Sequence, residues 1–243
     1  MPDFEVVGVT VRFGGNLALT DVSLSARGGQ VVGLIGPNGA GKTTLFNVIT
    51  GLQASTEGRV ELDGVDLTKL SPTKRARQGL ARTFQRLELF TMLSVRENVA
   101  VAAEVHRRWA RAKVDIDAQV DAILERVGLG SVADTRVTAL PTGQGRLVEL
   151  ARALACEPKV LLLDEPASGQ DDAETERFAV LLRELAAQDM AVVLVEHDMR
   201  LVMDVCDVIN VLNYGQVLAV GTPEEIRAHA AVREAYLGQG ADA

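Results

Sequence analysis

The chain contains two kinds of hydrophobic pattern, one alternating and one continuous. The alternating segments, whose period of two predicts strands with one buried face, are residues 4–13, 19–26 and 58–64. The continuous apolar runs, which are typical of strands buried on both faces of a parallel sheet, are residues 30–35, 158–164 and 191–195. The pattern therefore predicts an antiparallel β patch beside a mostly parallel sheet.

Helical patterns separate the continuous runs. Residues 44–49 form a short helix closed by Gly51, residues 71–156 are helical in character with few strand formers in a row, and residues 172–188 form a long helix. We interpret residues 104–113, a polar and basic segment, as an exposed helical insertion rather than a membrane or partner contact. Apolar positions at i, i+3, i+4 and i+7 predict one buried helix face, made of Leu147, Leu150, Ala151 and Leu154. Strands that alternate with helices predict an α/β fold.

The last part of the chain has its own pattern. Residues 208–212 and 216–220, joined by a short turn, predict a β-hairpin. Thr222, Pro223 and Glu225 are then typical of a helix start, with a threonine cap and an early proline. We expect one domain over residues 1–243. Its expected parts are a core (1–86 and 156–221), an inserted helical subdomain (87–155) and a C-terminal helix and tail (222–243).

Composition narrows the class of protein. With 243 residues, 47% of them hydrophobic, the chain can bury one large core. A net charge of −8 argues against a nucleic-acid groove as the main surface, and no apolar run approaches the ~20 residues that span a bilayer. Cys156 and Cys206 lie far apart among apolar neighbours, so we expect buried free thiols in a reducing, cytosolic compartment.

Residues 36–43 match the phosphate-binding loop G-x-x-x-x-G-K-[ST] at every required position. The loop lies between a predicted strand and a predicted helix, whose positive N-terminal end would face the phosphates. Its glycines let backbone N–H groups point inward, Lys42 would reach the β- and γ-phosphates, and the Thr43 hydroxyl would ligate Mg²⁺. The residues expected to contact the nucleotide are Gly36, Asn38, Gly39, Ala40, Gly41, Lys42, Thr43 and Thr44.

Two adjacent carboxylates end the second continuous run. Asp164 at such a strand end is suited to hold Mg²⁺, and Glu165, which faces the other way, can act as a general base toward attacking water. His197 follows the third run, so we expect it at the same edge of the sheet, where it can hydrogen-bond a γ-phosphate oxygen. Gln85 leads from the sheet into the helical stretch, and its amide oxygen is a further candidate Mg²⁺ ligand.

In their order and spacing, these motifs make the chain similar to the nucleotide-binding subunits of ABC transporters over essentially its whole length. The matching segments are the phosphate loop, Gln85, residues 140–144, the pair Asp164 and Glu165, residues 168–171 and His197. The resemblance implies a P-loop NTPase (RecA-like) core with a mostly parallel sheet, an antiparallel β patch and an inserted helical subdomain. It also implies hydrolysis of ATP with Mg²⁺, coupled to solute transport.

The resemblance adds roles that the residue pattern alone does not give. Phe13 matches the aromatic residue that stacks on adenine, and residues 140–144 match the family signature. Through Thr142, Gly143 and Gln144 the signature would bind ATP held by an opposite subunit. The family therefore implies a homo- or heterodimer with ATP at the interface, separate transmembrane permease subunits, and a position on the cytoplasmic face of the plasma membrane.

Within the family, the chain is most similar to importers of branched-chain or other hydrophobic amino acids. The similar segments are residues 81–86, 89–90, 196–199 and 234–238. The alternatives are the ATPase subunit of a lipid or lipopolysaccharide exporter, a soluble ABC ATPase acting on ribosomes or DNA, and a phosphate-loop kinase. The last two fit less well, because this sequence has neither a second cassette nor a long coiled-coil insert, and a kinase would not need Glu165 beside Asp164.

Two places depart from the family pattern. The signature normally carries serine second and glycine third, where this chain has Pro141 and Thr142. Proline offers neither a hydroxyl nor an N–H, so we expect Thr142, at the helix start, to supply the lost hydroxyl. Gln170 stands where the interface loop usually has leucine. Both changes bear on the strength of dimerisation rather than on hydrolysis.

Overall fold

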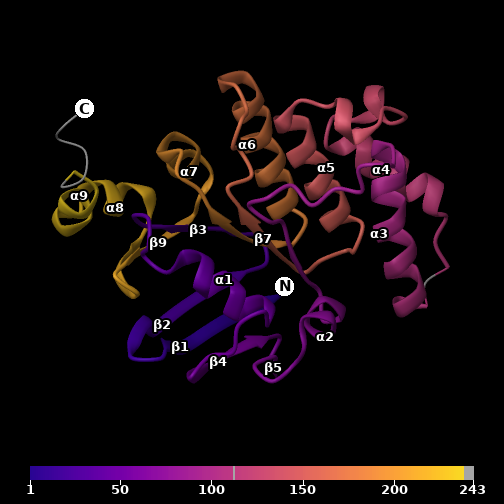
Figure 1. The fold of residues 1–243 in the computed structure, drawn as a ribbon. Helices are drawn as coiled ribbons and strands as arrows, with labels where there is room; N and C mark the ends of the chain where they lie inside the picture. The colour runs from indigo at the N-terminus through magenta and orange to yellow at the C-terminus, as the bar shows by residue number, and fades with distance from the viewer. Residues whose placement is uncertain (112, 238–243) are drawn as a thin grey trace.

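The computed structural model describes residues 1–111 and 113–237 and contains two β-sheets with helices between and above them (Figure 1). The first sheet is four-stranded and antiparallel, in the order β2-β1-β4-β5. Its strands are β1 (Asp3–Phe13), β2 (Asn16–Arg27), β4 (Glu57–Leu62) and β5 (Val65–Asp66). The alternating segments of the sequence thus form the antiparallel patch that they predict.

The second sheet is six-stranded and mostly parallel, in the order β10-β9-β3-β8-β7-β6. Only the β10–β9 hairpin pairs antiparallel, and the other pairings are parallel. The strands are β3 (Val31–Ile35), β6 (Leu80–Arg82), β7 (Val160–Asp164), β8 (Ala191–Val195), β9 (Val208–Asn213) and β10 (Gln216–Gly221). The fold class predicted from the sequence is confirmed.

Strand β6 corrects one expectation. It lies inside residues 71–156, which we expected to be helical, yet Leu80 and Arg82 pair with Val160 and Leu162 of β7. A strand of three residues is too short to show a hydrophobic period. Its position is fixed instead by the neighbouring strand β7, to which its backbone is hydrogen-bonded.

The parallel sheet is buried on both faces. Leu161 and Leu163 of β7 contribute to one hydrophobic core, and Val160 and Leu162, which alternate with them, contribute to the other. The first core lies under the later helices, and the second lies between the two sheets around α1 (Lys42–Thr50). This two-sided burial explains why these strands are continuously apolar.

Most of the helices after α1 cover the outer face of the parallel sheet, whereas the first of them packs against α1 and β6 (Figure 1). They are α2 (Pro72–Arg77), α3 (Val95–Ala110), α4 (Ile116–Arg126), α5 (Thr142–Leu154), α6 (Asp172–Ala186), α7 (Met199–Val205), α8 (Pro223–Ala228) and α9 (Ala230–Leu237), with 3-10 turns η1 (Gly130–Val132) and η2 (Val137–Ala139). Leu150, Ala151 and Leu154 of α5 are buried and Leu147 is partly buried, as the stripe predicts. In the part of the chain that the structure describes, no helix combines the length and apolar character needed to cross a membrane.

Arg75 of α2 fixes the C-terminal end of α1. Its buried guanidinium donates to the carbonyls of Val48 and Ile49 at 2.6 and 2.7 Å, and to that of Thr68 at 2.7 Å. The last carbonyls of a helix lack intrahelical partners and carry partial negative charge, so a buried cation there satisfies both needs. The helix that starts at the phosphate loop is therefore anchored at its far end by a side chain.

Helices α3, α4 and α5 form a separate group at one side of the molecule (Figure 1). Ser94 and Glu97 make a complete capping box at the start of α3. At the other end of α3, Trp109 is half-buried. Its Nε1 donates to His106 Nδ1 at 2.8 Å, and the Arg77 guanidinium of α2 lies 5.6 Å from its ring centre. Among the described residues of 104–113, Glu104, His106 and Trp109 are half-buried and the others are exposed, and Trp109 contacts α2. The boundaries at residues 87 and 155 stay a prediction, and residues 238–243 of the expected tail lie outside the described residues.

Candidate functional site

The phosphate loop connects β3 to α1 beneath the turn of the β9–β10 hairpin. A methyl group on Gly36 would lie 2.1 Å from the carbonyl oxygen of Leu212, so only glycine permits this approach. Lys42, buried at the start of α1, donates from Nζ to the carbonyl oxygens of Gly36 (2.6 Å) and Pro37 (3.1 Å). Burial lowers the pKa of Lys42, while the carboxylates of Glu165 and Asp164 partly offset that effect. The ammonium group thus lies inside the curve of its own loop.

A polar cleft of about 420 Å³ opens above this loop. Residues 38–44 form one wall, and Gln85, Asp164, Glu165 and His197 contribute from the other sheet strands and the β6–α3 loop. The structure therefore brings together most of the residues that the sequence predicts for nucleotide and metal binding, but Phe13, Gly36 and residues 142–144 do not line this cleft. Gly36 lies just behind this wall, at the base of the loop.

Glu165 lines the cleft and is held by two partners. Its Oε1 is 2.9 Å from His197 Nε2, and its Oε2 accepts a hydrogen bond from Gln85 Nε2 at 3.2 Å. Its backbone has φ 50°, a left-handed conformation that is rare for a non-glycine residue. Such strain is found where a side chain must be aimed, and here it turns Glu165 away from Asp164 toward His197.

Asp164 is almost fully buried and pairs with a residue that the sequence did not single out. Its Oδ2 accepts from Arg82 Nη2 at 2.9 Å, and its backbone N–H donates to Thr83 Oγ1 at 3.2 Å. Among the described residues, no hydrogen bond reaches Oδ1 of Asp164, although the residue lines the cleft. One carboxylate oxygen is thus fixed and the other is free to act as a ligand.

The oxygen donors of the cleft suit a hard divalent cation. Thr43, Gln85 and Asp164 all line it, and hydroxyl, amide and carboxylate oxygens are the ligands that Mg²⁺ takes in proteins. The free oxygen of Asp164 and the inward-facing ammonium of Lys42 are compatible with a Mg²⁺–triphosphate, which needs both a cationic and an anionic partner. The residues present therefore fit ATP with Mg²⁺.

Arg146 of α5 holds the backbone of the loop that carries Gln85. Its Nη1 donates to the Phe84 carbonyl at 2.7 Å, and its Nη2 donates to the carbonyl of Gln85 itself. The same Nη1 lies 3.2 Å from the buried carboxylate of Glu149, one turn along the helix. Helix α5 starts at the signature, so the signature and Gln85 are connected through one buried arginine.

Two more side chains of α5 bind the following residues of this loop. Glu149 Oε1 accepts from the Glu88 N–H at 2.9 Å, and Arg152 donates to the Glu88 carbonyl and lies 4.7 Å from the ring centre of Phe90. Burial raises the pKa of Glu149 and lowers that of Arg152. Charged side chains, rather than a sheet or helix ladder, therefore set the path of this segment.

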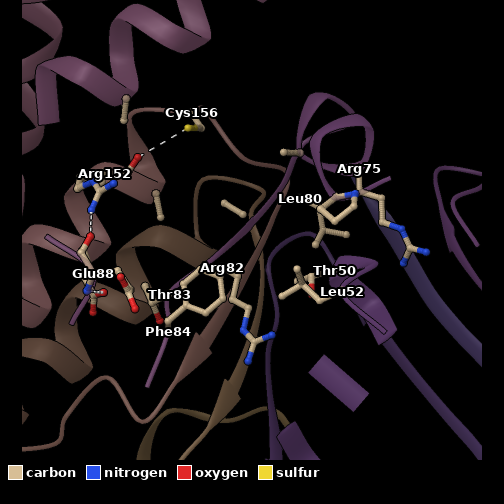
Figure 2. Close-up of a pocket in the computed structure, with 16 residues that line it drawn as sticks. Thr50, Leu52, Arg75, Leu80, Arg82, Thr83, Phe84, Glu88, Arg152 and Cys156 are labelled. Carbon is tan, nitrogen blue, oxygen red and sulfur yellow. Dashed lines mark hydrogen bonds between the residues drawn. The ribbon is translucent and has the colours of Figure 1, made fainter. Parts of the chain in front are cut away.

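A second depression, a groove of about 330 Å³, lies between α2 and β6 on one side and α3 and α5 on the other (Figure 2). Leu52 and Phe84 contribute exposed apolar surface to it. Cys156 also lines the groove and is only half-buried, so our expectation of two buried thiols is wrong for Cys156. It is right for Cys206, whose thiol pKa is raised by burial to about 12.

The signature residues lie away from the cleft within one chain. Pro141 precedes α5, and Thr142, the first residue of the helix, is exposed. A methyl group on Gly169 would lie 3.2 Å from Thr142 Cγ2, and one on Gly143 would lie 3.2 Å from Gln170 Cγ, so the two unusual segments are in contact. Phe13, half-exposed at the end of β1, also lies outside the cleft lining.

Several residues of the site escaped the sequence analysis. Tyr214 and Gly215, which we assigned only to a hairpin turn, line the cleft beside the phosphate loop, and so do Leu17 and Ala18. An aromatic residue in an exposed turn was the one available signal for Tyr214. Arg82 carried no signal, because its role depends on partners that are distant in the sequence.

Comparison with known proteins gives one family. The sequence model of the family described as "ABC transporter" matches residues 19–168, and that described as "Branched-chain amino acid ATP-binding cassette transporter" matches residues 216–242. The chain is 42% identical over 254 residues to the high-affinity branched-chain amino acid transport ATP-binding protein BraF of Pseudomonas aeruginosa, with 98% of each chain covered.

Solved structures that resemble this chain are also ATP-binding cassettes. The ADP conformation of MJ1267, an ATP-binding cassette of an ABC transporter, has a TM-score of 0.86 at 31% identity, covering 98% of this chain and 100% of the other. The dimeric post-hydrolysis state of the ATP-binding cassette MJ0796, bound to ADP and Pi, has a TM-score of 0.80 at 26% identity, covering 90% and 98% of the two chains.

Proposed function

The chain belongs to the ABC transporter ATP-binding family, and we propose that it is the ATP-hydrolysing subunit of an importer of branched-chain or other hydrophobic amino acids. The observation that carries the ATPase role is Glu165, held by both Gln85 and His197 at the mouth of the phosphate loop. The similarity to BraF over 98% of the chain and the match at residues 216–242 support the amino-acid substrate class.

In this proposal, the phosphate loop binds the triphosphate. Backbone N–H groups of residues 38–44 face the phosphates, and Lys42 exchanges its two carbonyl partners for phosphate oxygens. Phe13 stacks on the adenine from the end of β1. Thr43, Gln85 and Asp164 hold Mg²⁺, which when bound neutralises charge on the phosphates. The cost of burying the Lys42 ammonium is then offset by a full anion instead of by two carbonyls.

Hydrolysis requires a base beside the terminal phosphate, and Glu165 supplies it. Its carboxylate orients the attacking water and accepts a proton, while His197 bonds a γ-phosphate oxygen and keeps Glu165 in place. The Gln85 amide shares Glu165, so displacement of the Gln85 loop removes one of the two partners that aim the base. Catalysis in this account depends on the position of that loop.

The second ATPase subunit completes the site. Two chains facing head to tail place Thr142, Gly143 and Gln144 of one against the ATP held by the other, as the dimeric cassette bound to ADP and Pi supports. Residues 87–155 act as the part that moves when the dimer closes. The movement reaches Gln85 through Arg146, which contacts the loop backbone directly.

The transmembrane permease is a separate polypeptide that contacts the groove between α2, β6, α3 and α5. A partner seated there touches both the core and the helical group, and it meets the exposed rings and aliphatic groups of Leu52 and Phe84 (Figure 2). Binding to a permease places the chain on the cytoplasmic face of the plasma membrane. The net charge of −8 remains an argument against nucleic acid as the partner.

Two substitutions test the ATPase role together. Glu165→Gln should keep ATP binding and stall hydrolysis, leaving a long-lived ATP-bound dimer, because binding depends on the loop and water activation on Glu165. Lys42→Ala should instead lose ATP-dependent thermal stabilisation. ATPase rate, melting temperature and dimer fraction are measured on both. Hydrolysis by Glu165→Gln within about threefold of the parent, a barrier change under ~1 kcal/mol, would show the assignment to be wrong.

A further inference from the structure

Arg82 connects three elements of the candidate site through a single guanidinium group. Nη2 donates to Oδ2 of Asp164 at the end of β7, and Nη1 donates to Oδ1 of Asn47 in α1 at 2.7 Å. Arg82 itself ends β6, three residues before Gln85. We propose that Arg82 is a positioning residue, which holds one oxygen of Asp164 so that the other is presented to Mg²⁺. This inference rests on the proposed function of the cleft.

The guanidinium plane is fixed by aromatic rings as well as by hydrogen bonds. Its central carbon lies 5.3 Å from the ring centre of Phe46 and 5.0 Å from that of Phe84. Cation–π contacts of this kind are strongest where water is excluded, and the Arg82 side chain is only 6% exposed. Figure 2 shows Arg82 beside Phe84 where the groove reaches the sheet.

The chemistry of the contact requires arginine. A guanidinium can donate in two directions while its flat surface lies against aromatic rings, whereas a lysine ammonium is a strongly hydrated point charge without a flat face. Lysine at this position keeps the positive charge but has one nitrogen where the guanidinium uses two, so it cannot hold Asp164 and Asn47 in the observed geometry. Charge and geometry can therefore be separated by a single conservative substitution.

Arg82 would affect Mg²⁺ binding through the orientation of the Asp164 carboxylate. A carboxylate that is hydrogen-bonded through one oxygen presents the other in a fixed direction, and loss of such an outer contact weakens metal binding by about 10–100-fold. Simple charge repulsion predicts the opposite sign, because removing Arg82 would leave Asp164 more attractive to a cation. The direction of the change thus distinguishes positioning from competition.

The test is a Mg²⁺ titration of ATP binding in the Glu165→Gln background, which prevents turnover. ATP-dependent thermal stabilisation is recorded from EDTA to excess MgCl₂ for the parent, Arg82→Gln and Arg82→Lys. We expect the Mg²⁺ concentration at half-maximal stabilisation to rise about tenfold or more in both variants. ATP binding in EDTA should stay within about twofold of the parent, because the hydrogen bonds of the Arg82 side chain among the described residues go to Asn47 and Asp164 and not to the phosphate loop.

Two further variants guard against a purely structural effect. Asn47→Ala removes the other hydrogen-bond partner of Arg82 and should raise the Mg²⁺ requirement by a smaller factor. Arg59→Gln removes a surface ion pair with Glu61 and should leave the Mg²⁺ requirement unchanged. Nucleotide-free melting temperature is measured on each, and Arg82→Lys serves if Arg82→Gln does not fold. An unchanged or lowered Mg²⁺ requirement in Arg82→Lys overturns the inference, whereas a parent that does not bind ATP overturns the proposed function.

Discussion

The phosphate loop and the loop from Thr83 to Phe90 face each other across the cleft, but different groups hold them. The phosphate loop is fixed by backbone: the carbonyl of Leu212 closes on Gly36, and the Gly215 N–H donates to the Ala40 carbonyl at 3.0 Å. The Gln85 loop is held mainly by side chains of α5. Side chains can exchange partners without unfolding a strand or helix, so the first loop is suited to bind and the second to move.

The largest effect is expected when the backbone contact between Gly36 and Leu212 is disturbed. Gly36→Ala places a carbon 2.1 Å from the Leu212 oxygen, which must push the loop and the hairpin apart. We expect loss of ATP-dependent stabilisation and a fall above about 4 kcal/mol in the free energy of unfolding. Thermal and denaturant unfolding, with and without ATP, measure both quantities.

Gly39→Ala is the matched control. Apart from its chain neighbours, no described residue has an atom within 4 Å of a methyl group there, so only the strain of φ 80° remains. The free energy of unfolding should fall by about 1–2 kcal/mol. Equal effects of the two substitutions would contradict the idea that close backbone packing fixes the loop.

The next largest effect is expected at the side-chain-held loop. Arg146→Ala leaves buried Glu149 without its cationic partner, which should cost about 3 kcal/mol of unfolding free energy. It also frees the Gln85 carbonyl, so the ATPase rate should fall at least about tenfold while ATP affinity changes little. Arg146→Lys should restore much of the stability but little of the rate, because the single nitrogen of lysine cannot reproduce the fixed fork in which two guanidinium nitrogens each hold a different carbonyl.

Arg107 provides the control for this variant. It pairs with Glu104 at the same three-residue spacing, at 2.8 Å, but both side chains are exposed. Arg107→Ala should change the unfolding free energy by under about 1 kcal/mol and leave ATPase activity unchanged. A rate in Arg146→Ala close to that of Arg107→Ala would refute the connection between α5 and Gln85.

The smallest effect on the single chain is expected at Thr142, because in the proposed dimer its hydroxyl would bind the ATP held by the other subunit. If its hydroxyl has replaced the missing signature serine, Thr142→Gly should collapse ATP-driven dimerisation. Each hydrogen bond to the charged phosphate is worth roughly 1.5–3 kcal/mol. Thr142→Ser keeps the hydroxyl and should behave like the parent, and Pro141→Ser should add little. Light scattering with ATP in the Glu165→Gln background measures the dimer, and a normal dimer in Thr142→Gly rules out the replacement.

The sequence predicted the phosphate loop well and the Gln85 loop poorly. The reason is that backbone contacts build the first loop, whereas side chains from distant parts of the chain hold the second. A backbone-built site needs glycines and a lysine at fixed spacing, so residues 36–43 were readable as a motif. The strands beside it were equally clear, because burial on both faces leaves continuous apolar runs. Arg82, Arg146 and Arg152 were not readable, since the strand and loop atoms that they bind lie tens of residues away and an arginine with such partners looks like any other in a sequence. The three-residue strand β6 was hidden likewise.

The contact between Arg77 and Trp109 has an optical consequence. Trp109 is the single tryptophan of the chain, so the indole emission of the whole protein comes from the place where α3 meets α2. The indole is half-buried, donates a hydrogen bond to His106 and lies beside the Arg77 guanidinium. These surroundings determine its emission wavelength and fluorescence lifetime. Any rotation of α3 relative to α2 changes those surroundings. The protein therefore has an intrinsic fluorophore where α3 meets α2. Tryptophan emission can report a movement of α3 relative to α2 during an ATP cycle without an added dye.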